Sequence, residues 1–320
     1  MWVDFTYFSV YHITISTGRL ARDIPTEKGR KPLMIIDMHT HIFPRHIAEK
    51  TVEKLGTAAH IRPHTDGTLY GLLVSMRHSR IAYSVTQPAV TNPNSVEHLN
   101  SSIIEKILPR QEEGVLPFGG MHPDYPHVRR ELLRLKNAGI RGIKLHPAYQ
   151  RADLDDPRNL RILYEASDLG MIVLTHAGVD ISVNGYDYAS VEHILHVLKE
   201  VAPQKLVLAH MGGWGNWAQV ESDLAGAPVW LDTAFTYGRL DTYPGMQPSP
   251  HVGTVLAPAD FVRLCRKHGI SRILFGTDSP WQDQDEYVQR LRAIGLTAAE
   301  QESILGKNAA ELLELSGTAP

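Results

Sequence analysis

The sequence predicts a single (β/α)8 TIM barrel, an α/β fold in which eight parallel strands form a ring inside the helices. The chain has 320 residues, 43% of them hydrophobic and 21% charged, a size and composition that suit one barrel domain. From Leu33 onward, short runs rich in Val, Ile and Leu alternate with amphipathic stretches long enough for helices. That alternation is typical of parallel βα units. The first strand leads into His39-Thr-His41, not into the glycine-rich loop common in open doubly wound sheets.

Counting the apolar runs gives eight candidate strands. They are Leu33–Asp37, Ile81–Thr86, Leu116–Met121, Gly142–Leu145, Met171–Thr175, Lys205–Ala209, Val229–Asp232 and Arg272–Gly276. Helices such as Val128–Asn137 and Asn159–Leu169 lie between them, each followed by a glycine that favours helix termination. We expect residues 33–320 to form the barrel domain. Residues 1–32 are expected to form an N-terminal extension, which is either poorly ordered or packed on the barrel.

Charge and composition point to small-molecule partners. The formal net charge of -3 gives no positive field for nucleic acid or anionic lipid. The sequence has no apolar run of the roughly 20 residues that a membrane span needs and no signal-peptide pattern. The single cysteine, Cys265, reads as a packed thiol on an amphipathic helix, which fits a reducing cytoplasm. The long loop Thr233–Ala257 is expected either to cover the pocket or to pack against another subunit in a homo-oligomer.

Polar residues gather where the predicted strands end, which is where barrel enzymes place their active sites. His39 and His41 face the same way, because side chains alternate along an extended chain. Strands five, six and eight end in His176, His210 and Asp278, and strand four carries Lys144 followed by His146. A His-x-His pair alone is common in loops, but the convergence of several strand ends predicts a metal site.

Nitrogen and carboxylate ligands on rigid elements, with no thiolate, suit a catalytic divalent metal. Zinc is the first expectation, with manganese, iron and nickel as alternatives. Weaker candidates for substrate contact are His122 and His146, together with Trp214 and Trp281, which follow strands six and eight. Each of these four also has a purely structural reading. Asp232 at strand seven is a candidate acceptor for the second ring nitrogen of a ligand histidine.

Together with the strand-end set, four stretches resemble the amidohydrolase superfamily, and more closely its amidohydrolase-related branch. They are Gly142-Ile-Lys144-Leu-His146-Pro, Leu208-Ala-His210-Met-Gly-Gly213, Leu274-Phe-Gly-Thr-Asp278-Ser-Pro280 and Leu305-Gly-Lys-Asn308-Ala-Ala310. The resemblance runs from about Leu33 to Leu313, and the branch includes lactone hydrolases and the aminocarboxymuconate-semialdehyde decarboxylase group.

The resemblance implies that His39, His41, His176 and Asp278 hold the main metal and that Asp278 also moves a proton. His210 either binds a second metal or stays free to polarise the substrate or to move a proton. Lys144 is either a carbamate that bridges two metals or a charged lysine that binds a substrate carboxylate, so one or two ions are expected.

Two reactions fit these residues. The first is hydrolysis of an ester, lactone or amide bond of a small molecule by metal-activated water. The second is non-oxidative decarboxylation or hydration of a small carboxylic acid. A metal-binding scaffold without catalysis is disfavoured, because Asp278 and His210 are both present.

Overall fold

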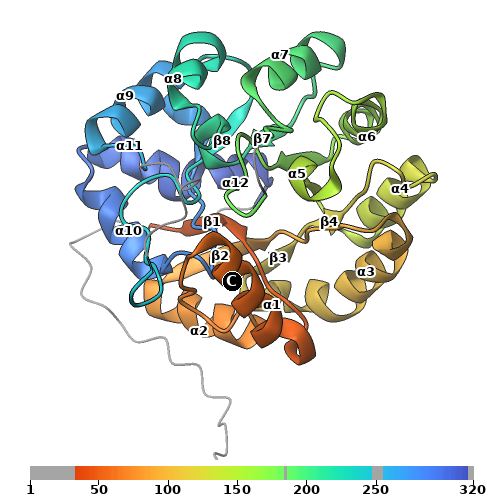
Figure 1. Cartoon of the computed structure of the whole chain (residues 1–320), viewed down its shortest axis with the longest axis horizontal. Helices are drawn as coiled ribbons and strands as arrows, with labels where there is room; N and C mark the ends of the chain where they lie inside the picture. Colours follow the sequence, from red (N-terminus) through yellow and green to blue (C-terminus); the bar gives the residue numbers. More distant parts are fainter. Residues whose placement is uncertain (1–32, 184–185, 247–254, 316–320) are drawn as a thin grey trace, which may run out of the picture. The chain divides into compact units, whose positions relative to one another are not determined.

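The chain forms a parallel (β/α)8 barrel, described here from a computed structural model for residues 33–183, 186–246 and 255–315. Figure 1 shows the strands at the centre with the helices arranged around them. The strands are β1 (Ile35–Thr40), β2 (Ile81–Thr86), β3 (Val115–Pro117), β4 (Gly119–Gly120), β5 (Gly142–Leu145), β6 (Ile172–Thr175), β7 (Leu206–Leu208), β8 (Trp230–Asp232) and β9 (Ile273–Leu274). The predicted fold class is confirmed.

Two hydrogen-bonded sheets, β1-β2-β3 and β4-β5-β6-β7-β8-β9, make up the ring. β3 and β4 are two pieces of one barrel strand interrupted at Phe118, whose N–H donates to the Thr86 carbonyl at 3.0 Å. The ring closes between its last and first strands, because Met38 N–H donates to the Phe275 carbonyl and Asp278 N–H to the His39 carbonyl, each at 2.8 Å. All eight predicted strands are present; two match the predicted ranges, Ile81–Thr86 and Gly142–Leu145, and the ends of the others differ by at most three residues.

The helices follow the strands in the expected alternation. They are α1 (Arg45–Ala59), α2 (Leu69–Ser79), α3 (Val96–Ser102), α4 (Val128–Ala138), α5 (Pro147–Gln150), α6 (Pro157–Asp168), α7 (Val191–Glu200), α8 (Trp217–Gln219), α9 (Pro258–His268), α10 (Gln284–Ala293), α11 (Ala298–Glu302) and α12 (Asn308–Leu312). α4 ends as predicted at Gly139, which takes a left-handed φ of 97°. α6 begins two residues before the predicted start, because Asp156 caps it by accepting the Arg158 N–H.

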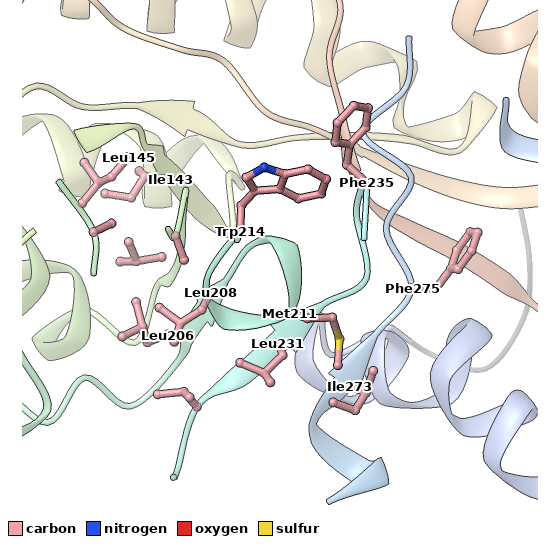
Figure 2. Close-up of a cluster of buried hydrophobic side chains, with 14 of the residues drawn as sticks. Ile143, Leu145, Leu206, Leu208, Met211, Trp214, Leu231, Phe235, Ile273 and Phe275 are labelled. Atoms are coloured by element: carbon pink, nitrogen blue, oxygen red, sulfur yellow. The ribbon is translucent and has the colours of Figure 1, made fainter. Parts of the chain in front are cut away.

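Buried side chains alternate between two clusters along the strands. On β7, Leu206 and Leu208 belong to the larger cluster and Val207 to the smaller one. The larger cluster includes many helix residues and therefore fills the space between the ring and the helices; Figure 2 shows part of it around Trp214 and Phe235. The smaller cluster joins β1, β2, β6, β7 and β9 to α12. This alternation fixes which strand residues face the helices.

Several sequence predictions concern segments at the margins of the barrel. The predicted extension, residues 1–32, lies outside the described residues, as do residues 247–254 of the long loop. Cys265 is buried on α9, as predicted, and burial raises the pKa of its thiol. Among the described residues, no helix is long and apolar enough to span a membrane.

Candidate metal centre and active site

His39, His41 and Asp278 meet where β1 and β9 end. The two Nε2 atoms lie 3.2 Å apart. Asp278 Oδ1 lies 3.1 Å from His41 Nε2 and 3.7 Å from His39 Nε2. Two ligands bound about 2.1 Å from one ion, at angles of about 90–109°, would be roughly 3.0–3.4 Å apart. Two of the three distances fall in that range, and the third, 3.7 Å, is slightly longer. The structure thus brings these three side chains together at one candidate metal-binding point.

The other nitrogen of each imidazole is held by a hydrogen-bond acceptor. His39 Nδ1 lies 2.8 Å from Asp232 Oδ2, and His41 Nδ1 lies 2.7 Å from the Gln87 carbonyl oxygen. Both acceptors favour a proton on Nδ1, which leaves the Nε2 lone pairs free to bind a cation. Asp232 is itself fixed, because its Oδ1 accepts the backbone N–H groups of His210 and Ala234 at 3.0 Å each. The predicted contact between Asp232 and a ring nitrogen of a strand-end histidine is therefore present.

A bulge in β1 directs His39 to this point. Between Asp37 and Thr40, three residue steps along β1 oppose the two steps from Ser84 to Thr86 along β2. Asp37 accepts hydrogen bonds from Gln284 on α10 and from Thr277, whereas His39 two residues later reaches Asp232 at the end of β8. Bulges commonly redirect a side chain beside an active site.

His176 and His210 complete the set of histidines at the strand ends. His210 Nε2 lies 3.2 Å from His176 Nδ1, and His210 Nδ1 lies 2.9 Å from the Ala234 carbonyl oxygen. His176 Nε2 is buried and makes no hydrogen bond. A buried imidazole nitrogen without a partner is costly unless a ligand binds it. This orphaned nitrogen, added to the nitrogen and carboxylate donors, fits a divalent metal.

Lys144 on β5 lies on the opposite side of His39 from Asp232. Its Nζ is 3.3 Å from His39 Nε2, and the residue is only 1% exposed. Burial lowers the pKa of Lys144 to about 8, opposed in part by the charges of Asp232 and Asp278. The neutral amine that either metal binding or carbamate formation requires is therefore accessible near neutral pH.

The electrostatics of the site favour neutral imidazoles at His39, His176 and His210 and an ionised carboxylate at Asp278. Burial, followed by the charge of Lys144, lowers the pKa of His39 well below its usual value and that of His176 to about 4. Burial and His176 lower the pKa of His210 to about 4. For Asp278, burial alone would raise the pKa, but His39 and His41 together hold it below its usual range. Neutral imidazoles and an ionised carboxylate are the forms that bind metals.

The metal-binding point opens into a cavity of about 320 Å³. Apolar side chains dominate its wall, including Ile42, Phe43, Ile61, Val179, Ile181, Phe235 and Trp281. Of the described residues that line it, Lys144 is the only lysine or arginine. His146, His176, His210, Trp214, Asp278 and Trp281, all predicted from the sequence, also line it. Phe235, near the start of the loop Thr233–Ala257, lines the pocket, so this end of the loop forms part of the wall.

His122 is the predicted residue that the cavity does not include. The residue is buried after β4, and its Nδ1 accepts the Asp124 N–H at 3.1 Å. That local contact supports the structural reading of His122.

A polar network on one wall was missed by the sequence analysis. Asp180 lies 3.5 Å from His146 Nε2 and accepts two hydrogen bonds from Ser182, whose hydroxyl also contacts Tyr149 at 3.0 Å. His146 stacks on Tyr149 with ring centroids 3.8 Å apart. Of these residues the sequence analysis named only His146. Asp180 and Ser182 lie on the irregular segment after β6 and Tyr149 lies on the four-residue α5, where no periodic pattern marks them.

Two further cavity-lining residues carry buried polar atoms without hydrogen bonds. They are the indole Nε1 of Trp214 and the side-chain oxygen Oε1 of Gln87. One is a donor and the other an acceptor, so the wall offers both kinds of group beside the metal-binding point.

Comparisons with solved structures agree with the fold. An uncharacterized TIM-barrel protein from Bordetella bronchiseptica matches with 18% identity and a TM-score of 0.69, over 89% of this chain and 100% of that chain. A dihydroxybenzoic acid decarboxylase from Polaromonas sp. JS666, solved with bound manganese, matches with 14% identity and a TM-score of 0.65, over 88% and 97%. A putative 2-pyrone-4,6-dicarboxylic acid hydrolase from Pseudomonas putida matches with 19% identity and a TM-score of 0.60, over 88% and 98%.

No curated protein sequence matches the chain. The Amidohydro_2 family, described as amidohydrolase, matches residues 36–315. That match extends from the second residue of β1 to just beyond α12. It therefore includes every residue of the candidate metal centre. The chain therefore belongs to the amidohydrolase family.

Proposed function

We propose that the protein is a metal-dependent hydrolase that cleaves an ester, lactone or amide bond of a small molecule. His39, His41, His176 and Asp278 would hold one divalent ion, with zinc as the first candidate. When bound, such an ion supplies an activated water and polarises a carbonyl group. The manganese bound to the decarboxylase from Polaromonas keeps manganese as an alternative.

The residues around the ion have separate tasks in this proposal. Asp232 and the Gln87 carbonyl hold His39 and His41 with Nε2 unprotonated. Asp278 is ionised and touches both imidazoles, so its carboxylate can take a proton from water and pass it to the leaving group. His210 remains neutral beside His176 and can bind the substrate carbonyl or move a proton.

The observation that carries the hydrolase proposal is the charge of the cavity. Its wall is mostly apolar, and Lys144 is the only lysine or arginine among its described residues. A polyanionic substrate would need several cationic partners there. The cavity therefore suits a compact, uncharged or singly negative ester, lactone or amide.

A specific observation also supports a second candidate, non-oxidative decarboxylation. Lys144 is buried beside the metal-binding point, where a charged ammonium group could hold one substrate carboxylate. Hydrolysis and decarboxylation would use the same metal ligands. If Lys144 is instead carbamylated, it would bridge two ions, with His210 as a ligand of the second.

A labelled-water assay separates the two reactions. Protein purified without added metal would first be analysed for metal content and for the mass of a lysine carbamate. It would then be incubated in ¹⁸O-labelled water with a panel of lactones and esters and a panel of hydroxylated aromatic acids. Hydrolysis places ¹⁸O in the product carboxylate, whereas decarboxylation releases carbon dioxide. Carbon dioxide release with no labelled carboxylate from any substrate would overturn the hydrolase proposal. We expect the enzyme in the cytoplasm, since its one cysteine is a buried free thiol.

A further inference from the structure

A second group of metal-binding side chains lies outside the cavity. Asp153 and Asp155 belong to the loop between α5 and α6, and His193 and His196 lie on α7. We call these four residues the α7 cluster. None of them lines the cavity of the metal centre. In Figure 1, α5, α6 and α7 are neighbours on one side of the ring.

The α7 cluster is organised around one carboxylate. Asp155 Oδ1 lies 2.8 Å from His193 Nδ1, and Asp155 Oδ2 lies 2.8 Å from His196 Nδ1. The two histidines are three residues apart on a helix, so they are adjacent on the same face. One carboxylate thus joins two imidazoles, each through the same ring nitrogen.

Asp153 adds an oxygen that has no hydrogen-bond partner. Its Oδ1 atom makes no hydrogen bond and lies 3.8 Å from His193 Nε2, although the side chain as a whole is 35% exposed and also interacts with the Tyr186 hydroxyl. Ligand atoms of Asp153, Asp155 and His193 all lie within 4.8 Å of one another. A buried carboxylate oxygen without a donor is costly, and a cation would satisfy it.

The two carboxylates of the α7 cluster bring two negative charges close together, which favours binding of a cation. The side chains of Asp155 and His193 are 20% and 22% exposed and those of Asp153 and His196 are 35% and 47% exposed, so an ion can reach the group from solvent. Mixed imidazole and carboxylate ligands select zinc, nickel or copper over calcium and magnesium.

From these contacts we propose that the α7 cluster is a second metal site, which binds zinc or a similar ion and ties the α5–α6 loop to α7. The α5–α6 loop is already joined to the segment just before α7 by a backbone hydrogen bond from Leu154 N–H to the Tyr188 carbonyl at 2.8 Å. They also flank Tyr149 and Ser182, which join across the cavity wall. An ion at the α7 cluster would therefore hold that wall in place.

Zinc titration of metal-stripped protein tests this site. Binding would be followed by calorimetry, with zinc counted by mass spectrometry after gel filtration. The full chain would be compared with His193→Ala and Asp153→Asn. His78→Ala, which removes an exposed histidine near the end of α2, is the matched control.

We expect wild type and His78→Ala to bind one zinc equivalent more than His193→Ala. In Asp153→Asn that equivalent should bind at least about tenfold more weakly, since loss of even an outer partner of a metal ligand costs about 10–100-fold in affinity. Equal zinc counts and affinities in wild type and His193→Ala would overturn the proposal and leave an ion-pair cluster.

Hydrogen exchange provides a second readout that does not depend on activity. Zinc should slow amide exchange in residues 151–156 and 186–190 of wild type and of His39→Ala, whose metal centre lacks a ligand. It should not do so in His193→Ala. If zinc still slows amide exchange in His193→Ala but no longer does so in His39→Ala, the effect comes from the metal centre. That result would overturn the proposal.

Discussion

Replacing Asp232 with asparagine tests whether the orientation of His39 controls metal binding. Asp232 uses both oxygens: Oδ2 faces His39 Nδ1 at 2.8 Å, and Oδ1 accepts the N–H groups of His210 and Ala234 at 3.0 Å each. Asparagine has one oxygen and one NH2 group at these two positions. It can therefore accept hydrogen bonds on only one of the two sides.

The geometry decides which side is satisfied. An NH2 group facing the two backbone N–H donors would leave both without a partner, at a cost of about 1–3 kcal/mol for each buried donor. An NH2 group facing His39 instead donates to Nδ1, which moves the ring proton to Nε2. The second arrangement disturbs fewer groups. It also blocks the lone pair that faces His41 and Asp278.

Asp232→Asn should therefore weaken metal binding about 10–100-fold while the barrel stays folded. That change corresponds to about 1.4–2.8 kcal/mol of binding free energy. The assay is a competition titration of metal-stripped protein against a chelator of known affinity, with circular dichroism to follow folding. Glu131→Gln is the matched control. Glu131 on α4 is a buried carboxylate that accepts hydrogen bonds from Asn100 on α3 and from Arg134, and it does not line the cavity. Wild-type affinity in Asp232→Asn would refute the reasoning.

Three further changes probe the metal and the cavity wall. His176→Ala should remove bound metal and turnover together. The circular dichroism spectrum should remain native, since the side chain lies at a strand end. Unchanged metal content by mass spectrometry would contradict this. Asp278→Asn should lower turnover about 10²–10⁴-fold with metal retained if Asp278 mainly moves protons. If it is mainly a ligand, metal and turnover should fall in parallel and recover with added metal, and near-normal values of both would exclude either role. Trp214→Phe deletes the unpaired indole N–H and should raise KM about 5–10-fold with little change in kcat, as expected for one lost hydrogen bond; an unchanged KM would show that the substrate does not use this donor.

The sequence predicts the strands, and the side chains that come together at their ends, well because both depend on local patterns. An apolar run of four to six residues identifies a buried strand, and a polar residue directly after it falls at the catalytic end of the barrel. His176, His210 and Asp278 could be found in this way. The convergence of His39 and His41 also followed from alternation, although the bulge between Asp37 and Thr40 has no signal in the sequence. Its position depends on pairing with β2, more than forty residues away.

The cavity wall is harder to predict, because loops build it and loops have no period. Gln87, Asp180 and Ser182 stand in the irregular segments after β2 and β6, whereas His122 stands at a strand end like a ligand and yet turns to the backbone of Asp124. In the proposed function, metal binding and substrate choice therefore rest on different parts of the chain. Strand ends would fix the metal ligands through short contacts such as that of Asp232 with His39, while the loops set the shape and charge of the space beside them. Changes at Gln87, Asp180 or Trp214 should consequently shift which substrate is bound, and changes at Asp232 should shift whether metal is bound at all.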